Sequence, residues 1–155
     1  MTRCPRRARM AFVANEDAPS RSAAVPATHV AAVMAALDGY LATFTSGFHG
    51  DDFGPHLDAY LFPHVRVLTD DVLCFATRDD VPPAFLRAGG VTDGFDHSEW
   101  IERRIVQASA DRVHVATVFR RVATDGSTLA TYTVLYILEP TADGWKVRGT
   151  STIPS

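Results

Sequence analysis

Three turn signals near the end of the chain constrain its fold more than any other feature of the sequence. Ala110-Asp111, Asp125-Gly126 and Asp143-Gly144 interrupt a stretch from Trp100 onward that otherwise holds only runs rich in Val, Ile, Thr and aromatic residues. Such runs are typical of β-strands, and Asp-Gly pairs are typical of tight turns between antiparallel neighbours. The pattern predicts a four-stranded meander.

Tight turns also determine which residues lie side by side on neighbouring strands, and therefore which residues share a face. If Asp125-Gly126 is a two-residue turn, the expected partners are Arg121 with Ala130, Phe119 with Tyr132, Thr117 with Val134, and Val115 with Tyr136. In the last strand the expected partners are Trp145 with Leu138, Val147 with Tyr136, Gly149 with Val134, and Ser151 with Tyr132. This register gathers the aromatic side chains on one face, which we assign to the helices.

The opposite face of the expected sheet is mixed in character. Its apolar middle, formed by Val118, Leu129, Leu135 and Ile137, is too large to be left in contact with water. We therefore expect a homodimer in which two sheets cover each other.

The residues before the meander show helical and strand patterns in turn. From Thr28, a candidate N-cap, apolar residues follow three-four spacing to Phe48, which predicts a long helix. A second helix is expected from residue 51 or 52 to 61, closed by Pro63. The remaining expected elements are a hairpin of His64–Thr69 and Val72–Ala76 turning at Asp70-Asp71, and a short helix from Val81 to Leu86 that ends at Gly89-Gly90.

A chain of 155 residues has room for one hydrophobic core. We expect a single α+β domain over residues 28–155, in which N-terminal helices pack on a curved antiparallel β-sheet. Residues 1–27 show no sustained period and are rich in Arg, Ala, Ser and Pro, which predicts a disordered extension.

Composition argues against several classes of partner. A formal net charge of -3 gives no bulk attraction for nucleic acid, and no run approaches the ~20 apolar residues that a membrane-spanning helix needs. Cys4 and Cys74 form neither a disulfide framework nor a metal site. We expect a soluble, reduced, cytoplasmic protein that does not bind nucleic acid or membranes.

The motifs of several common enzyme classes are missing from the sequence. It contains no Cys-x-x-Cys, His-Glu-x-x-His, Gly-x-Ser-x-Gly or Gly-Lys-Ser/Thr, which disfavours zincins, elbow-type serine hydrolases and P-loop enzymes. His49 and His56 form one local pair, for which exposure in a loop is favoured over metal ligation. The paired carboxylates at 51–52 and 79–80 are better explained as helix-start residues. We expect neither a metal nor a cofactor.

Polar side chains fall on the helix-facing side of the expected sheet, where burial without partners is unfavourable. The register places there Tyr132, Tyr136, Arg121, Thr117 and Ser151. Tyr40 of the first helix can reach the same space, and His64 and Arg66 enter it if the first strand has the matching parity. Either these groups satisfy one another, with Arg121 for instance paired to Glu102, or they line a pocket.

Two motifs resemble the nuclear-transport-factor-2-like superfamily, which includes ketosteroid isomerases and SnoaL-like polyketide cyclases. Tyr40-Leu-Ala-Thr-Phe-Thr-Ser-Gly47 is similar to the end of its first helix, and Asp143-Gly144-Trp145-Lys146-Val147 is similar to its last hairpin. The order of elements from Val30 to Ile153 also resembles that superfamily. The resemblance implies a cone-shaped α+β barrel with a pocket between helices and sheet, usually in a homodimer.

Ketosteroid isomerases use a first-helix tyrosine, an aspartate just after the first strand and an acid on the penultimate strand. Tyr40 matches the tyrosine and Asp70 lies close to the place of the aspartate, whereas the register puts Val134 at the position of the acid, which disfavours steroid isomerisation. A subgroup of mostly unassigned function is similar at Pro63-His64-Val65 and Phe119-Arg120-Arg121.

Two functional hypotheses remain open. In the first, the protein is an isomerase-, cyclase- or hydratase-type enzyme in which Tyr40 and Arg121 polarise a carbonyl or carboxylate and His64 or Asp70 is the general base. The ligand contacts expected in addition are Arg66, Thr117, Tyr132, Tyr136, Trp145 and Ser151. In the second, the domain is non-catalytic and binds a ligand, or a protein partner through its sheet face.

Overall fold

The computed structural model describes residues 26–88 and 93–154 of the chain. Its elements are α1 (Ala27–Gly50), α2 (Gly54–Asp58), β1 (Tyr60–Val67), β2 (Val72–Phe75), the 3-10 helix η1 (Arg78–Asp80), α3 (Pro83–Arg87), β3 (Phe95–Ala108), β4 (Val113–Ala123), β5 (Thr128–Thr141) and β6 (Gly144–Pro154). The predicted meander is confirmed as β3 to β6. The extension expected over residues 1–27 lies outside the described residues, except that α1 begins at Ala27 after Pro26.

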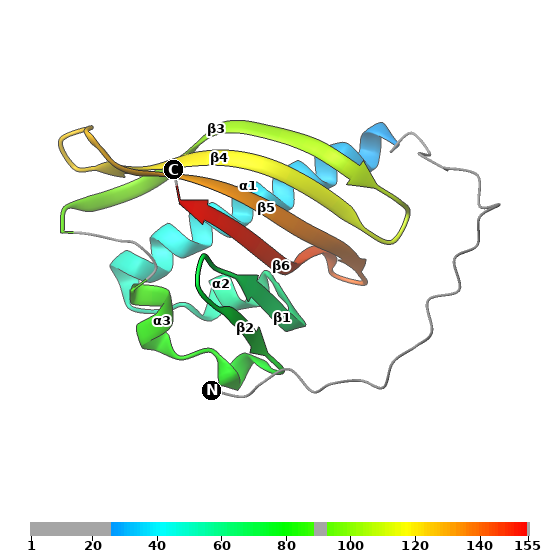
Figure 1. The fold of residues 1–155 in the computed structure, drawn as a ribbon, viewed down its shortest axis with the longest axis horizontal. Helices are drawn as coiled ribbons and strands as arrows, with labels where there is room; N and C mark the ends of the chain where they lie inside the picture. Colours follow the sequence, from blue (N-terminus) through cyan, green and yellow to red (C-terminus); the bar gives the residue numbers. More distant parts are fainter. Residues whose placement is uncertain (1–25, 89–92, 155) are drawn as a thin grey trace.

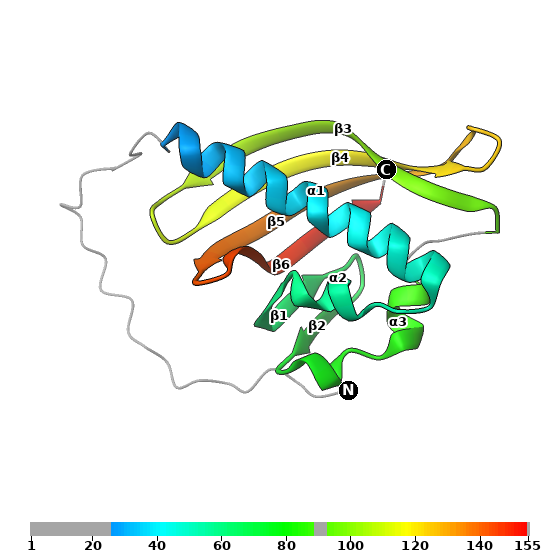
Figure 2. The same ribbon diagram turned by 180° about the vertical axis from the view of Figure 1, so that it is seen from behind.

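The strands form one six-stranded sheet with the order β2-β1-β6-β5-β4-β3 (Figure 1). All neighbours are antiparallel except β1 and β6, which run parallel. The sheet is curved but does not close into a barrel, and α1 lies across one of its faces (Figure 2). The fold is therefore of the α+β class, as expected, with an open mixed sheet in place of the expected antiparallel barrel.

The apolar stripe predicted for the first helix is the side of α1 that packs against the sheet. Val33, Leu37, Tyr40 and Phe44 are buried at the expected three-four spacing. Thr28 lies inside the helix and not at its cap, because the helix begins one residue earlier. By length and composition α1 could also cross a membrane, a property that it shares with core helices of soluble domains.

The second predicted helix is wrong at its end. α2 stops at Asp58, and Tyr60 and Leu61 already belong to β1. Pro63 lies inside that strand, where the register between β1 and β6 is irregular from Tyr60 to Val65. A proline is tolerated at such a position because no ladder hydrogen bond is required from it.

The register predicted for the middle of the meander is confirmed, and the register predicted for its last strand is wrong. Arg121 pairs with Ala130 and Phe119 with Tyr132, although a shift next to Arg121 lengthens the turn. In β6, Leu138 pairs with Val147, and an irregularity between Ile137 and Leu138 changes which side chains face α1. Thr150 and Thr152 consequently take the place expected for Ser151.

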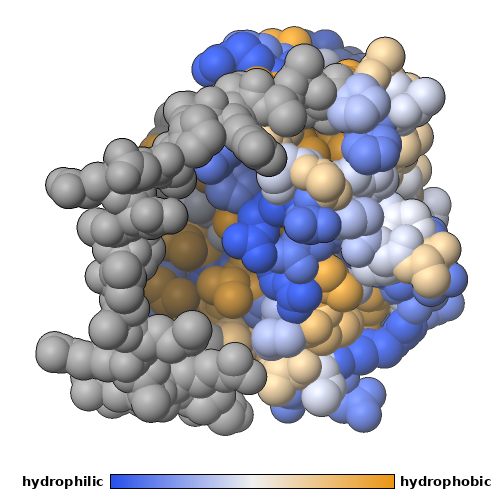
Figure 3. Space-filling view, turned by 90° about the vertical axis from the view of Figure 1, so that its right-hand side faces the viewer, coloured by the Kyte–Doolittle hydropathy of each residue, from blue (hydrophilic) through white to orange (hydrophobic). Residues whose placement is uncertain are grey.

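Two buried clusters of hydrophobic residues support the space between them. The first joins α1 to the sheet and includes Leu37, Leu138 and Val147. The second lies near α3 and the start of β3 and includes Phe44, Phe53, Phe75, Val81, Leu86 and Phe95. The side shown in Figure 3 carries many hydrophilic residues, with groups of hydrophobic residues among them.

Candidate functional site

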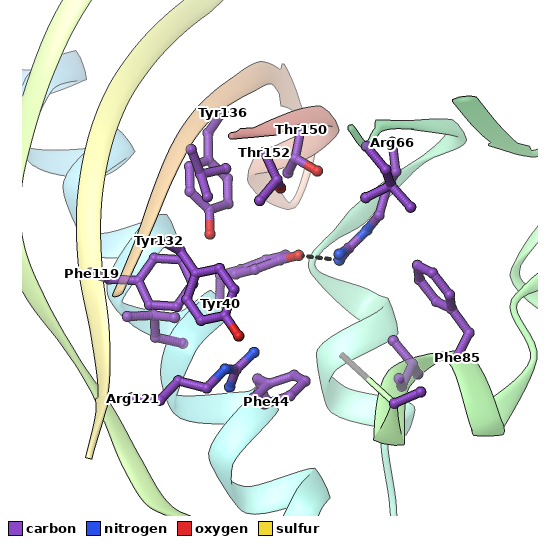
Figure 4. A pocket seen from close by; sticks show the side chains of 15 residues that line it. Tyr40, Phe44, Arg66, Phe85, Phe119, Arg121, Tyr132, Tyr136, Thr150 and Thr152 are labelled. Carbon is purple, nitrogen blue, oxygen red and sulfur yellow. Dashed lines mark hydrogen bonds between the residues drawn. The ribbon is translucent and has the colours of Figure 1, made fainter. Parts of the chain in front are cut away.

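A cavity of about 300 Å³ lies between α1, β1, α3 and the face of the sheet that α1 covers. Its lining residues are Tyr40, Leu41, Phe44, Arg66, Leu68, Phe85, Leu86, Ala88, Phe119, Arg121, Tyr132, Val134, Tyr136, Thr150 and Thr152. Figure 4 shows that aromatic rings make up much of the wall, and that two arginines enter from different elements. The lining includes five of the residues that were expected from the sequence to face a pocket: Tyr40, Arg66, Arg121, Tyr132 and Tyr136.

Arg66 is the cationic group that β1 brings to this cavity. Its Nη2 donates hydrogen bonds of 2.7 Å to the Tyr40 hydroxyl and 2.6 Å to the Tyr60 hydroxyl. Its guanidinium lies 5.3 Å from the centre of the Phe85 ring. Among the described residues no carboxylate forms an ion pair with Arg66, so the charge has only tyrosine and aromatic partners.

Arg121 is the second cationic group, and β4 carries it. Its guanidinium lies 4.5 Å from the ring centre of Phe44 and 5.4 Å from that of Tyr132. Burial lowers the pKa of Arg121, and the neighbouring Tyr132 opposes this shift. Glu102, the expected salt-bridge partner, lies opposite Val118 instead and pairs with Arg104. Arg121 is thus held mainly among aromatic rings.

Hydroxyl groups occupy the wall between the arginines. Burial raises the pKa of Tyr40 and of Tyr136, although the Arg66 charge acts in the other direction, so both phenols stay protonated and can donate hydrogen bonds. In the sheet, Arg66, Thr150 and Tyr136 are neighbours across β1, β6 and β5. The buried Thr150 hydroxyl has no hydrogen-bond partner among the described residues.

The two expected general bases lie outside the cavity lining. His64 is fully buried, its ring is stacked 4.0 Å from that of Tyr60, and its Nδ1 lies 2.9 Å from the Val147 carbonyl. Burial, followed by the charge of Arg66, lowers the pKa of His64 to about 3. Asp70 is exposed in the turn between β1 and β2. None of the fifteen described lining residues is a carboxylate or a histidine.

Of the remaining expected ligand contacts, some line the cavity and others do not. Tyr132 and Tyr136 line the cavity beside Tyr40, Arg66 and Arg121. Three others do not: the Thr117 hydroxyl donates to the Val134 carbonyl, Trp145 packs against His29, and Ser151 is opposite Leu135. The register change in β6 is the reason for the position of Ser151.

The burial of one residue beside the cavity was not expected from the sequence. His56, taken as exposed in a loop, is fully buried in α2, between Tyr40 and Phe44. Its spacing of four from Tyr60 is the signal that could have suggested a contact. Within the described residues no group of three or more His, Cys, Asp or Glu could hold a metal ion.

An α+β fold with a helix over a curved sheet and a polar-aromatic cavity between them defines a class of pocket-containing domains. The family described as NTF2-like protein (DUF6841) matches residues 31–155, and the chain belongs to that family. No curated protein matches the chain.

Solved structures share this fold at low sequence identity. A protein of unknown function with a cystatin-like fold from Nostoc punctiforme superposes with a TM-score of 0.65 and 11% identity, covering 84% of this chain and 94% of the other. A ketosteroid isomerase-like protein from Erwinia carotovora atroseptica superposes with a TM-score of 0.54 and 20% identity, covering 80% of this chain and 94% of the other. ActVI-ORFA from Streptomyces coelicolor superposes with a TM-score of 0.59 and 15% identity, covering 81% of this chain and 96% of the other. These similarities establish the fold, and any activity has to be inferred from the site.

Proposed function

We propose that the protein binds a small molecule bearing a carboxylate or a similar oxyanion in the cavity between α1 and the sheet. The observation that carries this proposal is Arg66, which lines the cavity and forms no ion pair within the described residues. An anionic ligand supplies the opposite charge, and a hydrogen bond to a charged group contributes about 1.5–3 kcal/mol. Arg121 adds a second positive charge to the lining.

The size and the walls of the cavity narrow the class of ligand. About 300 Å³ is the volume that roughly ten water molecules occupy in the liquid. Phe44, Phe85, Phe119 and Tyr132 present aromatic surface to this space. A flat acid with one ring, such as benzoate or cinnamate, therefore suits the cavity better than a fused multi-ring compound.

A second candidate function is carbonyl chemistry of the isomerase or cyclase type. The observation that favours it is the Tyr40 hydroxyl, which accepts a hydrogen bond from Arg66 and keeps its own proton to donate to a carbonyl oxygen. The described lining offers no carboxylate or imidazole as a base, so this candidate requires a base from the substrate or from water. Binding without proton transfer is the better-supported function.

A thermal-shift panel tests the proposal and separates the two candidates. Benzoate and cinnamate are compared with benzamide and cinnamamide, which have the same shape and no charge, and with cyclohex-2-enone as a neutral carbonyl compound. We expect the acids alone to raise the melting temperature, and Arg66→Gln to abolish the rise. The matched control is Arg104→Gln, because Arg104 is exposed and outside the cavity. Equal shifts with acids and amides would contradict anion binding, and a rise with the enone alone would favour carbonyl chemistry.

We also propose that the protein is a homodimer through the sheet. Ile101 and Ile153 are 58% and 62% exposed on β3 and β6, which leaves large apolar side chains in water in the monomer. Sedimentation equilibrium of the protein and of an Ile153→Glu variant tests this. A wild-type protein that stays monomeric at 100 μM would refute it.

A further inference from the structure

The buried pair His56 and Tyr60 lies behind Arg66 and does not line the cavity. The Tyr60 hydroxyl is 2.6 Å from Arg66 Nη2 and 3.3 Å from His56 Nε2. On the other side of the ring, His56 Nδ1 lies 3.1 Å from the Tyr40 carbonyl and 3.3 Å from the Thr43 hydroxyl. A continuous set of polar contacts thus joins α1, α2 and β1 behind the cavity wall.

Donor and acceptor chemistry assigns every proton in these contacts. The Tyr40 carbonyl can only accept, so Nδ1 of His56 carries a proton. A neutral imidazole has one N–H, and Nε2 is therefore an acceptor, which receives the Tyr60 O–H. The Tyr60 oxygen in turn accepts from Arg66. Every contact is satisfied in this arrangement, and a second proton on His56 would leave Tyr60 without an acceptor.

From this geometry we infer that His56 and Tyr60 form a neutral positioning relay, which holds the Arg66 guanidinium toward the cavity without cancelling its charge. The inference rests on the proposed function and concerns the same site. An aspartate or glutamate in the place of Tyr60 would also orient Arg66, but it would form an ion pair and compete with an anionic ligand. Tyrosine oxygens accept hydrogen bonds while leaving the full positive charge for the ligand.

The surroundings of the relay pack tightly around the His56 ring and keep it neutral. The His56 ring contacts the rings of Tyr40 and Tyr60 at centroid distances of 4.4 and 5.2 Å, and His64 stacks on Tyr60 at 4.0 Å. Burial, and next the charge of Arg66, lowers the pKa of His56 to about 3. Both hydrogens of Arg66 Nη2 are taken by tyrosines, whereas Nη1 has no partner among the described residues. The relay therefore leaves one end of the guanidinium for a ligand.

Tyr60→Phe tests the relay, because it removes one oxygen and no cavity contact. We expect Tyr60→Phe to bind benzoate 5- to 20-fold more weakly than the wild-type protein in calorimetry, while it still melts cooperatively. His56→Phe, which keeps the ring packing, is expected to show a similar loss of affinity. His56→Gln is expected to bind benzoate within about 3-fold of the wild-type affinity, because an amide can donate to the Tyr40 carbonyl and accept from the Tyr60 hydroxyl. Unchanged affinity in both phenylalanine variants would overturn the inference.

Nitrogen-15 NMR of histidine in the full chain gives a readout that does not depend on any ligand. The relay predicts the Nδ1–H tautomer for His56, and a shift of the Nε2 resonance in Tyr60→Phe as its hydrogen bond is lost. An Nε2–H tautomer in the wild-type protein would overturn the relay even if benzoate binds. If the wild-type protein does not bind benzoate and the NMR result is as expected, the relay stands and the proposed anion function fails for this probe.

Discussion

Lowering the pH from 7 to 5 is expected to destabilise the fold by about 4 kcal/mol, and two buried histidines are the reason. His56 and His64 are both fully buried, and burial lowers the pKa of each from 6.5 to about 3. At pH 5 the unfolded chain has bound a proton at each ring and the folded chain has not, so protonation favours unfolding. The free-energy difference is about 2 kcal/mol per histidine at this pH.

The stability that these histidines contribute is present above pH 6.5 and is lost as the pH falls toward 3. Urea unfolding followed by circular dichroism at pH 7, 6 and 5 measures the loss directly. His64→Gln keeps a donor for the Val147 carbonyl and removes the titration, so its loss between pH 7 and 5 is expected to be half that of the wild-type protein. His49→Gln is the control, because His49 is exposed.

One surface group acts in the opposite direction. Hydrogen bonds to Glu99 and then Asp96 raise the pKa of His97, which favours the folded state as the pH falls, but this site is exposed and screened. The reasoning would be refuted if the free energy of unfolding of the wild-type protein fell by less than about 1 kcal/mol between pH 7 and 5. An equal fall in His64→Gln and in the wild-type protein would refute the assignment to His64.

Three further substitutions test the packing around the site. Gly149→Ala is expected to destabilise the fold by about 1–3 kcal/mol, because its Cβ would lie 2.8 Å from the Val65 carbonyl oxygen, and urea unfolding at pH 7 measures this. Leu37→Ala, at a fully buried position of α1, is expected to cost about 2–5 kcal/mol in the same assay. Thr150→Val is expected to raise the melting temperature, because it removes a buried hydroxyl that has no partner among the described residues.

The parts of the fold that were predicted from sequence depend on strong local signals. Asp125-Gly126 placed β4 against β5, so Arg121, Tyr132 and Tyr136 were correctly assigned to the helix-facing side of the sheet. The apolar spacing of the first helix likewise placed Tyr40 toward the same space. These residues form most of the polar lining, and they could be predicted because turn chemistry and helical period depend on neighbours in the sequence.

The parts that were missed depend on contacts between distant residues. One irregularity between Ile137 and Leu138 exchanged Ser151 for Thr150 in the cavity wall, and no residue type signals it. Tyr60 was predicted to lie in the second helix, but it belongs to β1 and pairs with Val147 of the parallel strand β6. Its hydroxyl accepts a hydrogen bond from Arg66. The spacing of four could suggest a contact between His56 and Tyr60, but the approach of Arg66 to Tyr60 and the burial of His56 depend on how the distant elements pack.

Anion recognition by Arg66 is the central claim, and calorimetry with a matched pair of ligands tests it most directly. Benzoate and benzamide are titrated into the wild-type protein, Arg66→Gln and Arg104→Gln at pH 7. The account predicts that benzoate binds to the wild-type protein and to Arg104→Gln at least 10-fold more tightly than benzamide, and that Arg66→Gln loses this preference. Equal affinities of the acid and the amide for the wild-type protein, or a preference that survives in Arg66→Gln, would contradict it.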